Sequence, residues 1–143
     1  MQTSFQRFTV FACALLCAIT LAVSLHAQTK ATVQSAILPD TPVGRTFGKF
    51  LVAFNTGELE KMKQFHRENG GSEDNAEQDM GAYKRTGGLS FHSVKRGSDY
   101  ELEALVQAKQ DGQWLSFTVN VEEAAPHGIS RIGVKMAEPP SSR

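Results

Sequence analysis

The chain has 143 residues, and its 15 lysine and arginine residues balance 15 aspartate and glutamate residues. A balanced charge provides no basic surface for nucleic acid or anionic lipid, so we expect neither as a partner. Both cysteines, Cys13 and Cys17, fall in an apolar stretch near the N-terminus, so we expect no thiol or disulfide chemistry in the rest of the chain. The length that follows this stretch suits one domain with a core of its own.

The N-terminal stretch has the pattern of a secretory signal. Arg7 is followed by the uncharged run FTVFACALLCAITLAVSL, residues 8–25, and small Ala27 precedes a polar sequence. We therefore expect residues 1–27 to be a cleaved signal peptide that directs export to the periplasm or the extracellular space. The run of 18 residues is near the shortest length that crosses a bilayer as a helix, so membrane anchoring by an uncleaved leader is the alternative.

The rest of the chain divides into three segments. Residues 28–38 are polar and predict a mobile linker, and residues 39–138 carry the periodic patterns of a folded domain. The closing residues 139–143 begin with two prolines and predict a disordered tail.

Helical patterns occupy the first half of the domain. Thr41 and Pro42 suit the start of a first helix and Gly57 suits its end. A second helix is expected over residues 58–68 and a third over residues 74–86, after a capping Ser72. The apolar faces of these helices are Val43, Phe47, Phe50, Leu51 and Phe54 in the first, Leu59, Met62, Phe65 and His66 in the second, and Ala76, Met80 and Tyr83 in the third.

From Leu89 onward the apolar period changes to two, which predicts strands over residues 89–96, 100–109, 114–122 and 129–137. Short turns such as Asp111-Gly112 favour an antiparallel meander. The sequence therefore predicts an α+β fold, with three N-terminal helices packed on one face of a curved four-stranded sheet. Alternation assigns these residues to the inner face: Tyr100, Leu102, Ala104, Val106, Ala108, Leu115, Phe117, Val119, Val121, Ile132, Val134 and Met136. The outer face is expected to be polar, with Leu105 and Trp114 as exceptions.

Three segments together carry a family resemblance: TPVGRTFGKFLVAFNTGELEKMKQF, YKRTGGLSFHSV and PHGISRIGVKM. With the order of elements over about residues 39–137, they resemble a cystatin-like or nuclear-transport-factor-like (SnoaL-like) exported α+β domain. Such domains stand N-terminal to bacterial β-lactamase-type serine hydrolases and processing proteases, and the resemblance implies a cone-shaped fold. No S-x-x-K nucleophile motif is present, since the nearest string, TFGK, has Thr46 in the serine position. The resemblance therefore assigns no catalytic residue of a hydrolase to this chain.

The resemblance also implies a comparison with isomerases and dehydratases, which place a titratable group inside an apolar cone. Asp79 and Tyr83 lie four residues apart on the third predicted helix and are the best acid and base candidates. The plainer interpretation is an amphipathic helix with Asp79 at its edge and Tyr83 in the core. Since the histidines lie in separate elements, we expect neither a metal site nor a cofactor.

The leading hypothesis is a non-catalytic exported module that binds a small apolar ligand in the cone or a protein partner, with a homodimer through the sheet as a further alternative. Its expected cavity residues are Phe47, Phe50, Phe54, Met80, Tyr83, Tyr100, Leu102, Phe117, Val119 and Val134. The competing hypotheses are a small isomerase or dehydratase that uses Asp79 and Tyr83, and a stand-alone accessory domain of a hydrolase encoded elsewhere.

Overall fold

The computed structural model describes residues 37–141. The expected leader, residues 1–27, and all but the last two residues of the expected linker lie outside this part of the chain. Within residues 37–141, no helix has the length and apolar character needed to cross a membrane.

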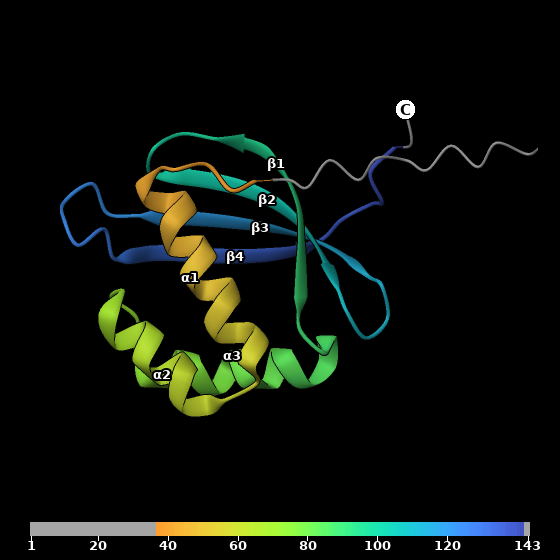
Figure 1. The fold of residues 1–143 in the computed structure, drawn as a ribbon, viewed down its shortest axis with the longest axis horizontal. Coiled ribbons are helices and arrows are strands. Elements are labelled where there is room, and N and C mark those ends of the chain that lie inside the picture. The colour runs from red at the N-terminus through yellow and green to blue at the C-terminus, as the bar shows by residue number, and fades with distance from the viewer. Residues whose placement is uncertain (1–36, 142–143) are drawn as a thin grey trace, which may run out of the picture. The chain divides into compact units, whose positions relative to one another are not determined.

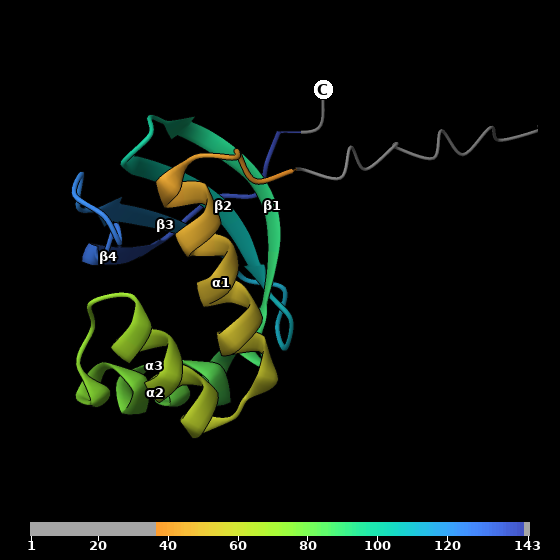
Figure 2. The ribbon, with the colours of Figure 1, turned by 60° about the vertical axis from the view of Figure 1, so that its left-hand side comes forward.

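The described residues form three helices followed by four strands (Figure 1). The helices are α1 (Pro42–Thr56), α2 (Leu59–Glu68) and α3 (Glu73–Thr86), and the strands are β1 (Leu89–Gly97), β2 (Glu101–Ala108), β3 (Trp114–Val121) and β4 (Ile129–Met136). The sheet has the order β1-β2-β3-β4, and every neighbouring pair is antiparallel. The view from the side shows the helices on one face of the curved sheet (Figure 2). The predicted α+β class and meander are confirmed, with element bounds that differ from the prediction by one residue or so.

The first helix begins and ends as its sequence predicts. The side chain of Thr41 accepts a hydrogen bond from the backbone N–H of Gly44 at 3.2 Å, and Pro42 occupies the first turn. Gly57 ends the helix with a φ of 69°, a left-handed conformation that glycine adopts without steric cost. This helix lies diagonally across the sheet and packs against β1, β2 and β3 (Figure 1).

The core is built around phenylalanines on α1. The rings of Phe47 and Phe50 lie 5.7 Å and 6.1 Å from the ring of Phe117 on β3. Phe50 also lies 5.7 Å from Phe65 of α2, so one ring joins the sheet to the second helix. Edge-on and tilted contacts at these spacings add to the free energy gained from burying apolar area.

The alternation of apolar and polar residues predicts the buried inner face correctly for the two central strands, β2 and β3. It predicts burial poorly for β4. The inward residues of β2 and β3 are buried, whereas Val134 and Met136 of β4 are 54% and 65% exposed. The difference arises because β4 is an edge strand that α1 does not cover. On the outer face Leu105 is only 3% exposed, and Pro139 and Pro140 of the expected tail lie beside it.

A carboxylate is buried on the outer face of the sheet. Glu103 of β2 accepts a hydrogen bond from the Ser116 hydroxyl at 2.8 Å, and its oxygens lie 2.9 Å from Arg96 Nε and 3.5 Å from Lys135 Nζ. The Ser116 hydroxyl and the nearby positive charges of Lys135 and Arg96 hold the pKa of Glu103 below its ordinary value of 4.5, against the opposing effect of desolvation. These four side chains, one from each strand, therefore link all four strands of the sheet.

The depressed pKa of Glu103 predicts how stability depends on pH. The unfolded chain takes up the Glu103 proton at a higher pH than the folded chain, so the stabilisation is fully present above pH 4.5 and is lost as pH falls through the folded value. We expect Glu103→Gln to lower the free energy of unfolding at neutral pH and to reduce its fall in acid. Urea denaturation across the pH range measures both effects. Glu101→Gln, an exposed position on the same face of β2, should change neither quantity.

Removal of a central aromatic ring should weaken the fold strongly. Phe47 has no exposed surface, so we expect Phe47→Ala to lower the free energy of unfolding by about 3–5 kcal/mol through lost burial and a residual cavity. Val52→Ala on the exposed side of α1 should cost well under about 1 kcal/mol by the same measurement, because surface truncations remove little buried area. Equal losses in the two variants would contradict this account of the core.

Candidate functional site

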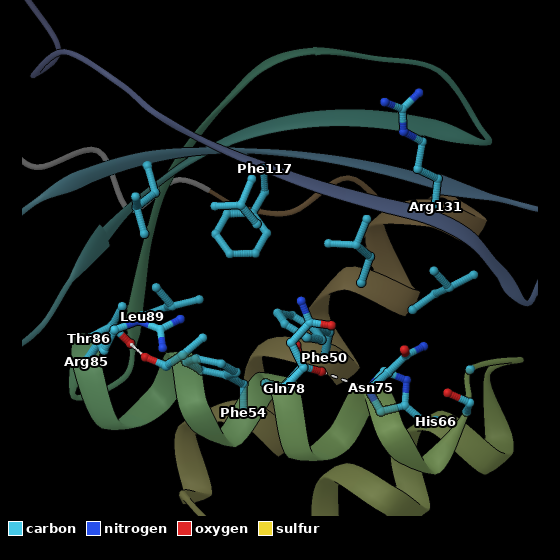
Figure 3. Close-up of a pocket in the computed structure, with 18 of the residues that line it drawn as sticks. Phe50, Phe54, His66, Asn75, Gln78, Arg85, Thr86, Leu89, Phe117 and Arg131 are labelled. Carbon is cyan, nitrogen blue, oxygen red and sulfur yellow. Dashed lines mark hydrogen bonds and ion pairs between the residues drawn. The ribbon is translucent and has the colours of Figure 1, made fainter.

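A cavity of about 810 Å³ lies between α3 and the β3–β4 half of the sheet (Figure 3). Its apolar side is formed by residues of α1 and the sheet: Phe50, Phe54, Leu89, Leu115, Phe117, Ile129, Ile132 and Val134. Because β4 lacks a covering helix, its inward side chains face this space and are not buried against a second layer. The cavity is therefore a consequence of where α1 crosses the sheet.

The opposite side of the cavity is one face of α3 and is mostly polar. Its residues recur at helical spacing and are Asn75, Gln78, Asp79, Ala82, Arg85 and Thr86. Figure 3 shows the amides of Asn75 and Gln78 projecting from α3 toward the sheet. The other face of the same helix packs into the core through Ala76 and Met80. The cavity thus sets hydrogen-bonding groups opposite an aromatic and aliphatic surface.

Backbone hydrogen bonds attach the turn before α3 and the C-terminal end of α3 to the sheet and its turns. At the N-terminal side, the Ile129 N–H at the start of β4 donates to the Asn69 carbonyl at 2.6 Å. At the C-terminal end, the Gln110 N–H from the β2–β3 turn donates to the Thr86 carbonyl at 2.8 Å. These bonds fix the position of α3 relative to β4 and to the β2–β3 turn, on either side of the cavity.

The cavity also contains a histidine–carboxylate pair. Nε2 of His66 on α2 lies 2.7 Å from Oδ2 of Asp79 on α3. The His66 side chain is 4% exposed, whereas the Asp79 side chain is 24% exposed and lines the cavity. A carboxylate accepts, so Nε2 carries the proton in this bond. His66 also lines the cavity, and its bond fixes the direction in which the Asp79 carboxylate points.

The second nitrogen of His66 is closed off by the turn between α2 and α3. Nδ1 is buried and has no hydrogen-bond partner within residues 37–141. It packs against Gly71, where an added Cβ would collide with Nδ1, and the Gly71 N–H donates to the His66 carbonyl at 2.8 Å. The imidazole lines the cavity, but Nε2 is bonded to Asp79 and Nδ1 packs against Gly71, so the ring acts by positioning the Asp79 carboxylate.

The structure distributes the predicted cavity residues between two places. Phe50, Phe54, Phe117 and Val134 line the cavity. Phe47, Met80, Leu102 and Val119 are buried in the core, and Tyr100 is partly buried against it.

The two candidate acid and base residues are not brought together. Asp79 lines the cavity, but Tyr83 is not among the lining residues. The ring of Tyr83 lies 5.7 Å from the ring of Phe54, and its hydroxyl lies beside Gly57 at the end of α1. The partner of Asp79 is His66, which the sequence suggested only as a boundary residue of the second helix.

Sequence reasoning missed the polar wall formed by Asn75, Gln78 and Arg85. A signal was present, because Asn75, Asp79, Ala82 and Thr86 repeat at the same helical spacing as the core stripe of α3. Within the described residues, histidine, cysteine, aspartate and glutamate side chains do not form a group of three that could hold a metal ion.

Comparison with known proteins finds no match to this chain among family models, curated proteins or solved structures.

The contact between Gly71 and His66 predicts a specific substitution effect. Gly71→Ala places a methyl group against the imidazole, so the ring and the attached Asp79 must shift, at a cost of about 1–3 kcal/mol in the free energy of unfolding. Gly81→Ala in α3 is the matched control, because its Cβ meets only Arg85 at 3.8 Å. That change should stabilise the helix by about 0.5–1 kcal/mol. Chemical denaturation distinguishes the two, and stabilisation by both would show that Gly71 has free space.

Proposed function

We propose that this domain is an exported module that binds a small, mainly apolar molecule between α3 and the sheet. The observation that carries the proposal is a cavity of about 810 Å³ with an aromatic and aliphatic side and a polar side. Small-molecule sites commonly combine this size with a largely apolar lining and a few polar groups that orient the ligand. The export part of the proposal is supported by the sequence of residues 1–27 alone.

Exposed apolar surface on β4 supports the proposal energetically. Val134 and Met136 remain in water in the free protein, and Val134 lines the cavity. A ligand that covers apolar surface gains about 25 cal/mol for each Å² removed from water. The backbone hydrogen bonds of Asn69 and Thr86 hold α3 in position before a ligand binds. A site that is already formed loses little conformational entropy when a ligand fills it, and this favours binding.

Membership of the cystatin-like or nuclear-transport-factor-like group is part of the same proposal. It is supported by the order of elements, by helices on one face of a curved antiparallel sheet, and by a cavity between them. An accessory role beside a separate hydrolase would be one use of such a module.

An acid or base role for Asp79 is the second candidate function. It is favoured by the 2.7 Å bond that orients this carboxylate beside a partly apolar cavity. Tyr83 is absent from that cavity, so the catalytic version would depend on Asp79 with His66 as its positioning residue. Asp79→Asn separates the two functions, since it would abolish turnover and leave the binding of a neutral apolar probe intact.

Binding can be tested with N-phenyl-1-naphthylamine, a neutral dye whose fluorescence rises in apolar surroundings. We expect the protein to bind the dye in the cavity and Val134→Arg to weaken binding by about tenfold or more, because a charged side chain then occupies the apolar wall. Val134 is half exposed, so the fold should tolerate the change.

The control is Val52→Arg, the same substitution on the exposed side of α1 at a residue that does not line the cavity. It should leave the affinity for the dye unchanged. A protein that does not bind the dye, or equal weakening by both variants, would count against the cavity as the binding site.

A further inference from the structure

The cavity contains one carboxylate that the fold holds in place. Asp111 also lines the cavity, but it lies in the exposed β2–β3 turn and accepts a hydrogen bond from the Gln113 N–H at 3.0 Å. Asp79, by contrast, extends from the middle of α3, whose C-terminal end and preceding turn are hydrogen-bonded to other parts of the fold, and its Oδ2 is bonded to a buried imidazole. Only Asp79 is therefore preorganised to meet a ligand inside the cavity.

The charge of Asp79 has no cationic lysine or arginine partner within residues 37–141. Its one ion-pair contact there is with His66, whose Nδ1 is buried without an acceptor, so the geometry suits the imidazole tautomer that carries its proton on Nε2. Arg85 lines the same side of α3 six residues further on, which is about 9 Å along the helix axis. The second oxygen of Asp79 is left to accept a hydrogen bond from a molecule in the cavity.

The neighbouring lining residues define what kind of donor suits this oxygen. Phe50, Phe54 and Phe117 border the cavity as buried core residues, and Ile132 and Val134 of β4 provide its accessible apolar surface. A ligand displaces water from the carboxylate, and a charged donor compensates that loss better than a neutral one.

We infer that the ligand is an amphipathic amine, with a cationic nitrogen paired to Asp79 and an apolar body against Ile132 and Val134 of β4. This inference rests on the proposed function, because it specifies the class of molecule that the same cavity binds. His66 acts as the positioning residue, and Asn75 and Gln78 supply amide groups beside the amine site.

The test uses three probes with the same eight-carbon chain: octylamine, octanol and octanoate. Each displaces N-phenyl-1-naphthylamine from the full chain at neutral pH, below its own aggregation concentration. We expect octylamine to displace the dye at a concentration about tenfold lower than octanol, and octanoate to be the weakest of the three. Asp79→Asn should bring octylamine to the level of octanol and leave octanol itself unchanged.

Asp111→Asn is the matched control, since it removes a carboxylate from the same cavity at an exposed position. It should preserve the preference for octylamine. Equal displacement by octylamine and octanol in the unmodified protein overturns the inference, as does a loss of preference in Asp111→Asn as large as in Asp79→Asn.

Two further readouts keep the outcomes separate. If Asp79→Asn fails to fold, the second measurement is the displacement assay in high salt. Salt screens the ion pair, so it should lower the affinity for octylamine and leave the affinity for octanol unchanged. An unchanged affinity for octylamine in high salt would then overturn the inference. If neither the dye nor octanol binds, the proposed function and this inference are both contradicted. Binding of both with no advantage for the amine removes this inference alone.

Discussion

The packing of α1 against β3 is the contact on which the rest of the domain depends. Phe47 and Phe50 meet Phe117 near the middle of the sheet, and Phe50 extends the same cluster to Phe65 of α2. A single helix covers only part of a four-stranded sheet, so a diagonal position over β1, β2 and β3 leaves β4 bare. The buried aromatic cluster and the open apolar strand are thus two results of one packing arrangement.

The turn between α2 and α3 connects the edge strand β4 to the polar side of the cavity. Gly70 approaches Gly128 closely, and Asn69 accepts a hydrogen bond from the first residue of β4. The next residue, Gly71, leaves room for the His66 ring, which in turn orients Asp79. Three consecutive residues therefore connect the edge strand, the buried histidine and the cavity carboxylate, and side chains larger than hydrogen at positions 70 and 71 would strain these contacts.

Much of the fold could be predicted from sequence because its signals are local. The capping of α1 by Thr41 and Gly57 and the alternation in β2 depend on nearest neighbours along the chain. The exposure of Val134 could not be read in this way, because it depends on which strand lies at the edge and where α1 ends its crossing. The pairing of His66 with Asp79 was equally inaccessible, since it requires the rotation of two helices about their axes. The spacing of Asp79 and Tyr83 suggested a pair, but α3 directs Tyr83 toward Phe54 and away from the cavity.

The polarity of α3 explains why the cavity does not close. Collapse of the helix onto β4 would bury Val134 and Ile132, but it would also strip water from the amides of Asn75 and Gln78 and from the charge of Arg85. Each polar group buried without a partner costs about 1–3 kcal/mol, and a charged group costs more. Covering two aliphatic side chains recovers at most a comparable amount, about 1.5–3 kcal/mol each. The backbone bonds of Asn69, in the turn before α3, and of Thr86, at its C-terminal end, oppose the same movement, and the polar composition of the helix opposes it as well. A ligand of the proposed kind would resolve this conflict, because it would cover the apolar wall and provide hydrogen-bond partners to the polar one.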